Sequence, residues 1–181
     1  CPHHLDLMQW LCGVPKRVHA SAYYGKYHDI EVEDDVTAFF EYENGATGMF
    51  ITTTGETPGT NRFEISGTKG KLVCENDKLI WIKNSEDSRK FSSESEGGFS
   101  RPEIEVIEVE TDGINDQHKG IINNFANALL GLEEFFVDGK EGINGVELMN
   151  AIELSGWRGG NRVELPVNGK EYYNELMKRC A

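Results

Sequence analysis

The chain lacks the segments that would place a protein in or across a membrane. Its 181 residues include no run of 18 or more apolar side chains. Its first residues, from Cys1 to Asp6, have neither the basic start nor the apolar stretch of a signal peptide. No Asn-x-Ser/Thr acceptor for glycosylation occurs either. The sequence therefore predicts a cytoplasmic protein with no membrane partner.

Cysteine and positive charge are both scarce. The four cysteines lie far apart and form no CxxC pair, so we expect reduced thiols that act as small hydrophobic residues. Lysine and arginine total 18 against 31 acidic residues, which gives a net charge of -13. This excess of negative charge repels phosphate backbones. We therefore predict no nucleic-acid partner.

A glycine-rich loop for a dinucleotide is also missing. No GxGxxG sequence follows a predicted strand, so the chain has no visible means of holding a dinucleotide by itself. Residues 67–71, Gly-Thr-Lys-Gly-Lys, have two residues between the glycines where a phosphate-binding loop has four. Leu72 replaces the Ser or Thr that would bind magnesium. This segment is predicted to be a turn.

What the sequence does contain is the pattern of an α+β domain. Apolar residues at helical spacing predict helices over about 4–12, 118–130, 142–157 and 171–179. β-Branched and aromatic residues predict a sheet that begins near Arg17, with strands at 36–42, 46–54, 62–65, 71–75, 79–83, 103–109 and 162–167. Residues 84–101, rich in Ser, Glu and Gly, are expected to be mobile. This grouping predicts a largely antiparallel open sheet, with helices packed on one face and the other face available for oligomerisation.

The clearest hairpin pattern lies around Asn44-Gly45. If these two residues form the turn, Phe40 faces Met49 and Phe39 faces Phe50. Apolar side chains then lie on both faces of the sheet. Because helices on a single face cannot cover them all, we expect the domain to form a homo-oligomer through its sheet.

Three segments carry side chains that suit chemistry, and each also has a plainer interpretation. His3 and Asp6 can share one side of a helix's first turn, or Asp6 can simply stabilise the helix N-terminus. Residues 52–62 offer the hydroxyl, amide and guanidinium donors that a sugar needs, or form a solvated loop. Residues 31–35, a run of acids, are either a charged sheet edge or a substrate contact.

Several segments resemble the C-terminal domain of the Gfo/Idh/MocA oxidoreductases, which include glucose-fructose oxidoreductase and inositol dehydrogenases. The first is Cys-Pro-His-His-Leu-Asp at 1–6, which continues to Pro15. The second is Glu-Ile-Ser-Gly-Thr-Lys-Gly-Lys-Leu at 64–72, and the third is Asp-Gly-Lys-Glu-Gly at 138–142. Further similarity lies at 151–155 and 163–166. Together these segments follow the family's order over nearly the whole chain.

The resemblance implies that substrate and cofactor are bound mainly by different domains. Residues 1–181 would form the C-terminal substrate-binding and oligomerisation domain, and an N-terminal Rossmann domain, absent from this chain, would hold NAD or NADP. The implied reaction is oxidation of a secondary alcohol of a sugar, polyol or cyclitol. We expect the chain alone to be inactive, because it would carry only part of the active site.

The resemblance also assigns residues. His3 and Asp6 match the last two members of the family motif Asp/Asn-x3-His-x2-Asp, whose first member would fall just before Cys1. We expect His3 to move the hydroxyl proton and Asp6 to orient His3 or the helix. The family's lysine, on a Glu-Lys-Pro segment, belongs to the absent domain. Contacts with substrate hydroxyls are expected from Arg62, Thr60 and His118.

Two other functions stay open at the level of sequence. A non-catalytic sugar-binding or regulatory member would keep the fold without turnover, and loss of the family's lysine upstream would indicate it. A metal-dependent hydrolase built on His3, His4 and Asp6 would need stoichiometric metal. The other histidines are too scattered to supply further ligands at a sensible spacing, so we expect no metal site.

Overall fold

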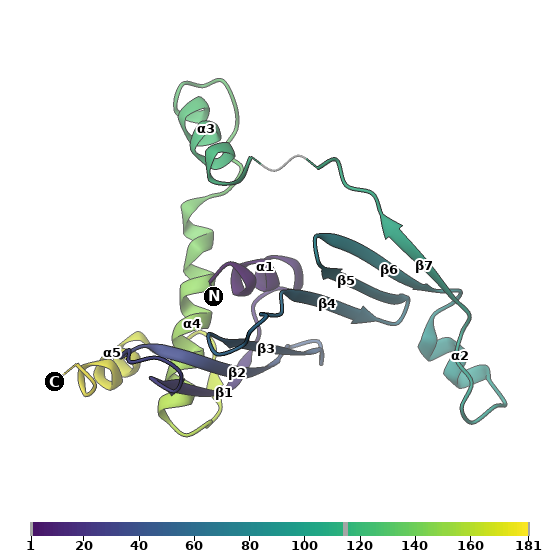
Figure 1. Cartoon of the computed structure of the whole chain (residues 1–181), viewed down its shortest axis with the longest axis horizontal. Coiled ribbons are helices and arrows are strands. Elements are labelled where there is room, and N and C mark those ends of the chain that lie inside the picture. The colour runs from purple at the N-terminus through teal and green to yellow at the C-terminus, as the bar shows by residue number, and fades with distance from the viewer. Residues whose placement is uncertain (1, 114–115, 181) are drawn as a thin grey trace. The chain divides into compact units, whose positions relative to one another are not determined.

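The chain forms two compact units in a computed structural model that describes residues 2–113 and 116–180. The first unit consists of Cys1–Thr57 and Asn123–Ala181, and the second consists of Pro58–Ile122 (Figure 1). Within the described ranges, no helix combines the length and the apolar character needed to cross a membrane.

The first unit is a four-stranded antiparallel sheet with helices on one face. Its strands are β1 (Arg17–Tyr24), β2 (Glu33–Glu41), β3 (Thr47–Thr53) and β8 (Val163–Glu164), in the order β3-β2-β1-β8. Helix α4 (Gly142–Trp157) follows the short helix η1 (Gly139–Glu141) and packs on β1 and on α1 (Pro2–Cys12). Helix α5 (Gly169–Met177) packs on α4. The structure confirms the predicted helix 142–157, and it starts α1 and α5 two residues earlier than predicted.

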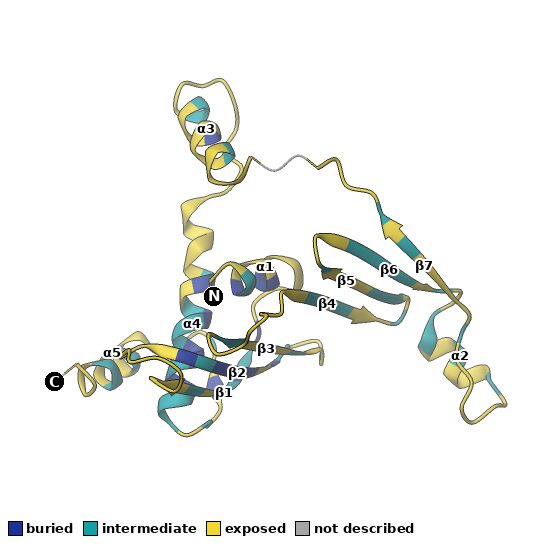
Figure 2. Cartoon of the chain, viewed as in Figure 1, coloured by how far each residue is buried: buried dark blue, intermediate teal, exposed yellow. Residues whose placement is uncertain are grey.

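Helix α4 lies close against β1. The buried Ser155 hydroxyl accepts a hydrogen bond from the Ala20 amide at 2.8 Å and donates one to the Asn161 carbonyl at 2.7 Å. A Cβ at Gly156 would lie 2.9 Å from the Cβ of Ala22, so a side chain there would push the helix away. The apolar core is drawn from both layers (Figure 2): Leu5, Met8, Val18, Ala20, Val36, Ala38, Phe40, Leu148, Ala151, Ile152, Leu154 and Val163.

The β2–β3 hairpin has a different register from the one predicted. Phe39 lies opposite Met49, and Phe40 lies opposite Gly48, one residue away from the expected pairing. The Tyr42 amide donates to the Ala46 carbonyl at 2.9 Å, which leaves three residues in the loop instead of two. Gly45 closes this loop with a φ of 83°, a left-handed conformation that favours glycine. The prediction of a turn at Gly45 is confirmed, but the predicted loop is one residue too short.

The shift of one residue exchanges the faces of β3. Phe50 lies on the same face as Phe40, towards the helices, whereas Met49 and Ile51 share the open face with Phe39. Burial follows this assignment, because Phe40 is fully buried and Phe39, Met49 and Ile51 are 38%, 65% and 66% exposed. Helices therefore cover one face of this sheet, as predicted, and apolar side chains remain on the other.

The second unit is a four-stranded antiparallel meander. Its strands are β4 (Arg62–Gly67), β5 (Gly70–Glu75), β6 (Lys78–Asn84) and β7 (Ile104–Val109), paired in chain order. Gly67 and Gly70 pair across the first turn, and Asn76 and Asp77 form the second with positive φ values. The predicted turn in residues 67–71 is therefore confirmed, but it is limited to residues 68–69, and its flanking residues belong to β4 and β5.

Two further predictions are wrong in part. The segment 84–101 contains a helix, α2 (Ser88–Glu94), whose N-cap Asp87 accepts hydrogen bonds from the amides of Arg89 and Lys90. This cap supplies the acceptor that a short polar helix needs, which its composition did not reveal. The last strand, expected over 162–167, is limited to Val163–Glu164, because Pro166 has no amide hydrogen to continue the pairing.

Helix α3 (Gln117–Leu129) begins in the second unit and continues into the first. Its buried Asn124 donates to the Glu134 carbonyl at 2.9 Å and accepts from the Phe136 amide at 3.0 Å, so the following loop folds back on the helix. We had expected this helix to pack on the sheet. Instead its apolar residues are more than half exposed at Ile122, Phe125 and Leu129. The apolar spacing predicts the helix correctly, but the prediction that the helix packs on the sheet is wrong.

Candidate functional site

The N-terminal helix α1 carries His3 and Asp6 near its start. Leu5 and Met8 are buried, and they fix the helix against the first unit, whereas His3 and Asp6 are exposed. The Asp6 carboxylate accepts a hydrogen bond from the Gln9 side chain at 3.0 Å. A Cβ on Gly145 of α4 would lie 3.6 Å from the same carboxylate. Asp6 is therefore hydrogen-bonded within α1 and lies near Gly145 of α4, and its orienting role stays a prediction.

The second unit holds Arg62, and its guanidinium is engaged in a network of charges. Arg62 donates to Glu75 at 2.6 Å and to Glu64 at 2.5 Å, and Lys71 donates to Glu64 at 2.5 Å. The hydrogen bonds from Lys71 and then from Arg62 lower the pKa of Glu64 to about 2. Ion pairs as exposed as these are screened by water and contribute little to stability. The role of Arg62 as a substrate contact stays a prediction.

Thr60 and His118, the other predicted substrate contacts, also belong to the second unit. Thr60 lies in the loop before β4, and His118 lies in the first turn of α3; both are exposed. The predicted site residues are thus divided between the units, with His3 and Asp6 in the first and Arg62 in the second. Their meeting around one substrate stays a prediction.

A cavity of about 360 Å³ lies within the first unit, between the covered face of the sheet, α4 and α5. Its floor is apolar, with Leu5 and Phe50 among the lining residues, and its polar lining includes Thr52, Thr53 and Thr54 at the end of β3. The predicted donor-rich segment therefore contributes three hydroxyl side chains to a concave surface. A volume of this size lies in the range of small-molecule sites.

Two polar residues of this cavity were not among the sequence candidates. The Tyr172 hydroxyl of α5 donates to the Glu153 carboxylate of α4 at 2.9 Å, and the Tyr172 ring stacks on Trp157 with centroids 5.4 Å apart. Burial raises the pKa of Glu153; the Tyr172 hydrogen bond lowers it, and the neighbouring Glu33 raises it again. In the sequence, the only sign of the Glu153–Tyr172 contact is the position of Glu153 beside the apolar face of α4.

The acidic run 31–35 has a structural role at the edge of this cavity. Asp34 is buried, and its carboxylate accepts hydrogen bonds from the amides of Lys26, Tyr27 and His28 at 3.0, 2.7 and 3.1 Å. Burial alone would raise the pKa of Asp34, but these three donors bring it below its ordinary value. Asp34 therefore anchors residues 26–28 to the start of β2, and the run is more than a charged edge.

The third function considered from the sequence was a metal-dependent hydrolase. Across residues 2–113 and 116–180, no group of three or more His, Cys, Asp or Glu side chains is placed to hold a metal ion.

Fold and site together define an α+β domain with one helix-covered sheet face and a histidine-bearing helix at its start, but with no dinucleotide-binding glycine loop in its sequence. Residues 1–73, from α1 into β5, match the GFO/IDH/MocA C-terminal domain. The expected resemblance to the C-terminal domain of Gfo/Idh/MocA oxidoreductases is thereby confirmed. A comparison with curated protein sequences gives no match.

Solved structures of oxidoreductases share the fold over most of the chain. The WlbA dehydrogenase from Bordetella pertussis, solved with NADH and UDP-GlcNAcA, is 25% identical with a TM-score of 0.58, covering 92% of this chain and 44% of that one. The aldose-aldose oxidoreductase from Caulobacter crescentus, complexed with glycerol, is 19% identical with a TM-score of 0.66, covering 91% and 45%. An NAD-binding protein from Listeria innocua is 19% identical with a TM-score of 0.64, covering 90% and 45%. The chain thus spans less than half the length of each of these three structures.

Proposed function

We propose that this chain is the C-terminal domain of an NAD(P)-dependent oxidoreductase that acts on a secondary alcohol of a sugar, polyol or cyclitol. The observation that carries the proposal is the family match over residues 1–73, which includes the helix with His3 and Asp6. The WlbA structure, which contains NADH and a nucleotide sugar, supports this class of cofactor and substrate. Inositols are included as candidate substrates because the family resemblance extends to inositol dehydrogenases.

This chain's own residues do not fit a dinucleotide. The sequence contains no glycine loop of the required pattern, and a net charge of -13 opposes a pyrophosphate. The cofactor would therefore be held mainly by a Rossmann domain elsewhere in a longer protein, where it would accept a hydride. His3 would accept the hydroxyl proton, and Asp6 would keep α1 oriented through its contacts with Gln9 and α4. Arg62, Thr60 and His118 would position the other hydroxyls.

The proposal is tested by cofactor reduction. A longer protein that carries this segment and a Rossmann domain is mixed with NAD or NADP and with a panel of aldoses, polyols and inositols. We expect nicotinamide reduction with at least one of them, and none from the 181-residue chain alone. Tight sugar binding without reduction of either cofactor would instead identify a non-catalytic member of the fold.

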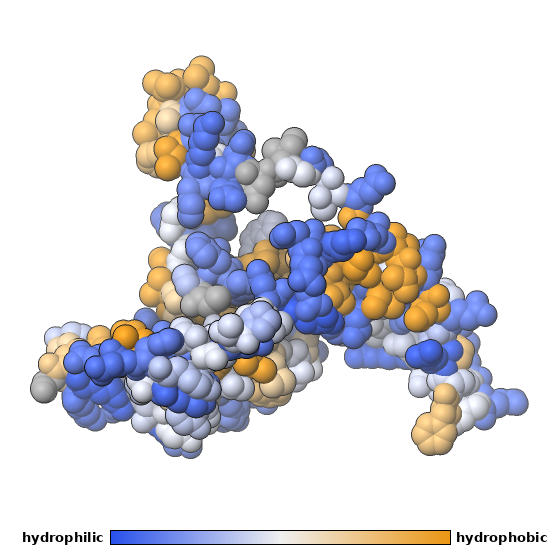
Figure 3. All heavy atoms as spheres, in the orientation of Figure 1, coloured by the Kyte–Doolittle hydropathy of each residue, from blue (hydrophilic) through white to orange (hydrophobic). Residues whose placement is uncertain are grey.

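We further propose that the chain self-associates through the open faces of its sheets. In the second unit the paired strands place apolar residues in two rows across one face, Phe63–Cys74–Leu79–Val109 and Ile65–Leu72–Trp81–Ile107. Apolar side chains gather over β5, β6 and β7 in Figure 3. In the first unit Phe39, Met49 and Ile51 lie exposed on the uncovered face. Contiguous apolar surface of this kind usually marks an interface.

Leu72→Glu is expected to weaken this self-association by at least about tenfold, since a buried unpaired carboxylate is costly at an apolar interface. Val106→Glu, on the opposite face of the same sheet, is the matched control and should have little effect. Sedimentation velocity over a range of concentrations measures both. A chain that stays monomeric at high micromolar concentration, or equal effects of both variants, would contradict the proposal.

A further inference from the structure

The cavity of the first unit is lined by acidic residues and by no basic ones. Its lining includes Glu33, Asp34, Asp35 and Glu153, and, among the residues that the structure describes, no lysine, arginine or histidine. Two of the four carboxyl groups are already engaged, because Lys26 pairs with Asp35 at 2.5 Å and three backbone amides donate to Asp34. Glu33 and Glu153 form no ion pair within the described part of the chain. The cavity therefore carries negative charge that no cation of this chain offsets.

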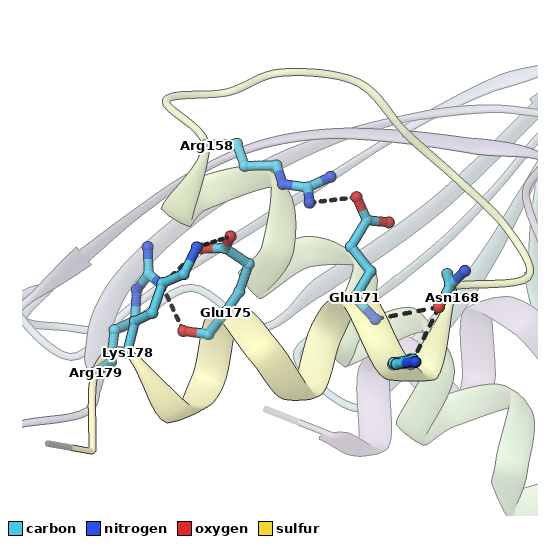
Figure 4. Close-up of polar contacts among 7 residues, drawn as sticks. Arg158, Asn168, Glu171, Glu175, Lys178 and Arg179 are labelled. Atoms are coloured by element: carbon cyan, nitrogen blue, oxygen red, sulfur yellow. Dashed lines mark hydrogen bonds and ion pairs between the residues drawn. The ribbon is translucent and has the colours of Figure 1, made fainter.

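The basic residues beside α5 are engaged with other acids. Arg158 pairs with Glu171 at 2.6 Å, and Lys178 and Arg179 pair with Glu175 at 2.7 and 3.1 Å (Figure 4). Neither of these two glutamates lines the cavity. The three cations are therefore held by acids outside the cavity.

Glu153 is the carboxylate best placed to bind a cation in this cavity. The Tyr172 hydroxyl donates to it at 2.9 Å, which fixes the orientation of the carboxylate. The side chain is half-buried, and burial raises the pKa of Glu153, as expected where little compensates the negative charge. Water and salt screen a half-buried charge less than an exposed one. A cation in the cavity would therefore be attracted more strongly than a cation on the open surface.

The apolar part of the lining decides which kind of cation fits. Leu5, Phe50, Met149 and Ile152 line the cavity from α1, β3 and α4. A hydrated metal ion gains nothing from such a surface, and among the described residues no group of three or more His, Cys, Asp or Glu side chains is placed to hold one. An aliphatic chain that ends in an ammonium group would bury its carbons on these residues and place its charge at Glu153.

The lining also offers acceptors for the hydrogens of an ammonium group. Such a group donates three hydrogen bonds and accepts none. Besides the carboxylates, the lining contains the Asn150 amide and the hydroxyls of Thr52 and Thr54. All these residues belong to the first unit. The cavity can therefore satisfy both the charge and the hydrogen-bonding needs of an ammonium group without the second unit.

We propose that the cavity of the first unit binds a primary ammonium group carried on an aliphatic chain, as in a free alkylamine or a lysine side chain. The ammonium group pairs with Glu153, and the carbons lie against Phe50 and Ile152. Glu33, which is exposed, adds a second negative charge to the lining. This binding does not depend on the proposed oxidoreductase function, because it uses neither the cofactor nor the residues of the proposed active site.

The test compares hexylamine, 1-hexanol and hexanoate, which share one aliphatic chain and differ in charge. Each is titrated at neutral pH into the 181-residue chain, and NMR follows the methyl signals of Met149 and Ile152 in the cavity lining. We expect hexylamine to bind at least about tenfold more tightly than 1-hexanol, because hydrogen bonds between charged groups are stronger than neutral ones. Hexanoate should bind more weakly than either, since the carboxylates repel it.

Glu153→Gln removes the charge but keeps an acceptor for Tyr172. It should weaken hexylamine by at least about tenfold and leave 1-hexanol unchanged. Glu33→Gln, at an exposed position, should also weaken hexylamine, and it secures the test if Glu153→Gln does not fold. Glu141→Gln is the matched control, because it removes the same charge from an exposed residue next to the start of α4 that does not line the cavity. It should leave hexylamine binding nearly unchanged.

The source of the ammonium group is distinguished by N-acetyl-lysine methylamide, which carries it on a peptide backbone. Binding as tight as that of hexylamine would support the proposal with a lysine side chain as the ligand, and weaker binding would support it with a free amine. Equal affinities for hexylamine and 1-hexanol, or a hexylamine affinity unchanged in both cavity variants, would overturn the proposal. Signal changes confined to residues outside the cavity would also overturn it.

Discussion

Replacing Phe40 by alanine is expected to lower the free energy of unfolding of the first unit by about 3–5 kcal/mol. Phe40 is fully buried on the helix-covered face of the sheet, beside Val18 of β1 and Gly48 of β3. Truncation removes most of its buried apolar area and leaves a cavity that the close α4–β1 packing prevents from collapsing. Urea unfolding followed by far-UV circular dichroism measures the loss.

Phe39 provides a control one residue away. It lies on the open face of the same strand and is 38% exposed, so Phe39→Ala should cost less than about 1 kcal/mol in the monomeric chain. The contrast between the two phenylalanines also tests the register of the hairpin. Equal losses from the two substitutions, or a larger loss at Phe39, would contradict the assignment of the faces.

The second large effect is expected on catalysis. In the longer oxidoreductase proposed above, His3→Ala should reduce kcat by roughly 100-fold or more, the typical contribution of a group that transfers a proton. The side chain is exposed near the start of α1, so its loss should leave the unfolding midpoint nearly unchanged. Steady-state kinetics and thermal unfolding of the same preparation separate these two effects.

His4 is the matched control, because it has the same chemistry one position along the helix, about 100° away around its axis. His4→Ala should retain most of the activity. If His3→Ala turned over substrate at the normal rate, His3 would have no part in the proton step. If both variants lost activity together with stability, the helix rather than the histidine would be responsible.

Most of the architecture follows from local patterns in the sequence. The 3.6-residue period of α4 and the glycines that end it predict its bounds, and turn residues such as Asn76-Asp77 locate the meander strands. The hairpin register was missed because a positive φ at Gly45 suits both two-residue and three-residue loops. Helix α2 was missed because it buries none of its residues and depends on the Asp87 cap.

The candidate site was predictable only where a family motif carried it. His3 and Asp6 stand in one short motif, so a single sequence can suggest them. The contact between Glu153 and Tyr172 joins two helices, and Glu33 comes from a strand more than 100 residues away. No local spacing connects such residues, because the sheet and α4 bring them together only when the core of the first unit forms.

The central claim is that this domain serves an enzyme that moves a hydride from a secondary alcohol to a nicotinamide. Its most direct test uses the sugar or inositol found in the cofactor screen, deuterated at the reacting carbon. The full protein is incubated with this substrate and with oxidised cofactor, and the cofactor is analysed by mass spectrometry. The account predicts one deuterium in the reduced nicotinamide for each alcohol oxidised. Reduced cofactor without deuterium, or oxidised alcohol with no deuterium transferred to the nicotinamide, would contradict it.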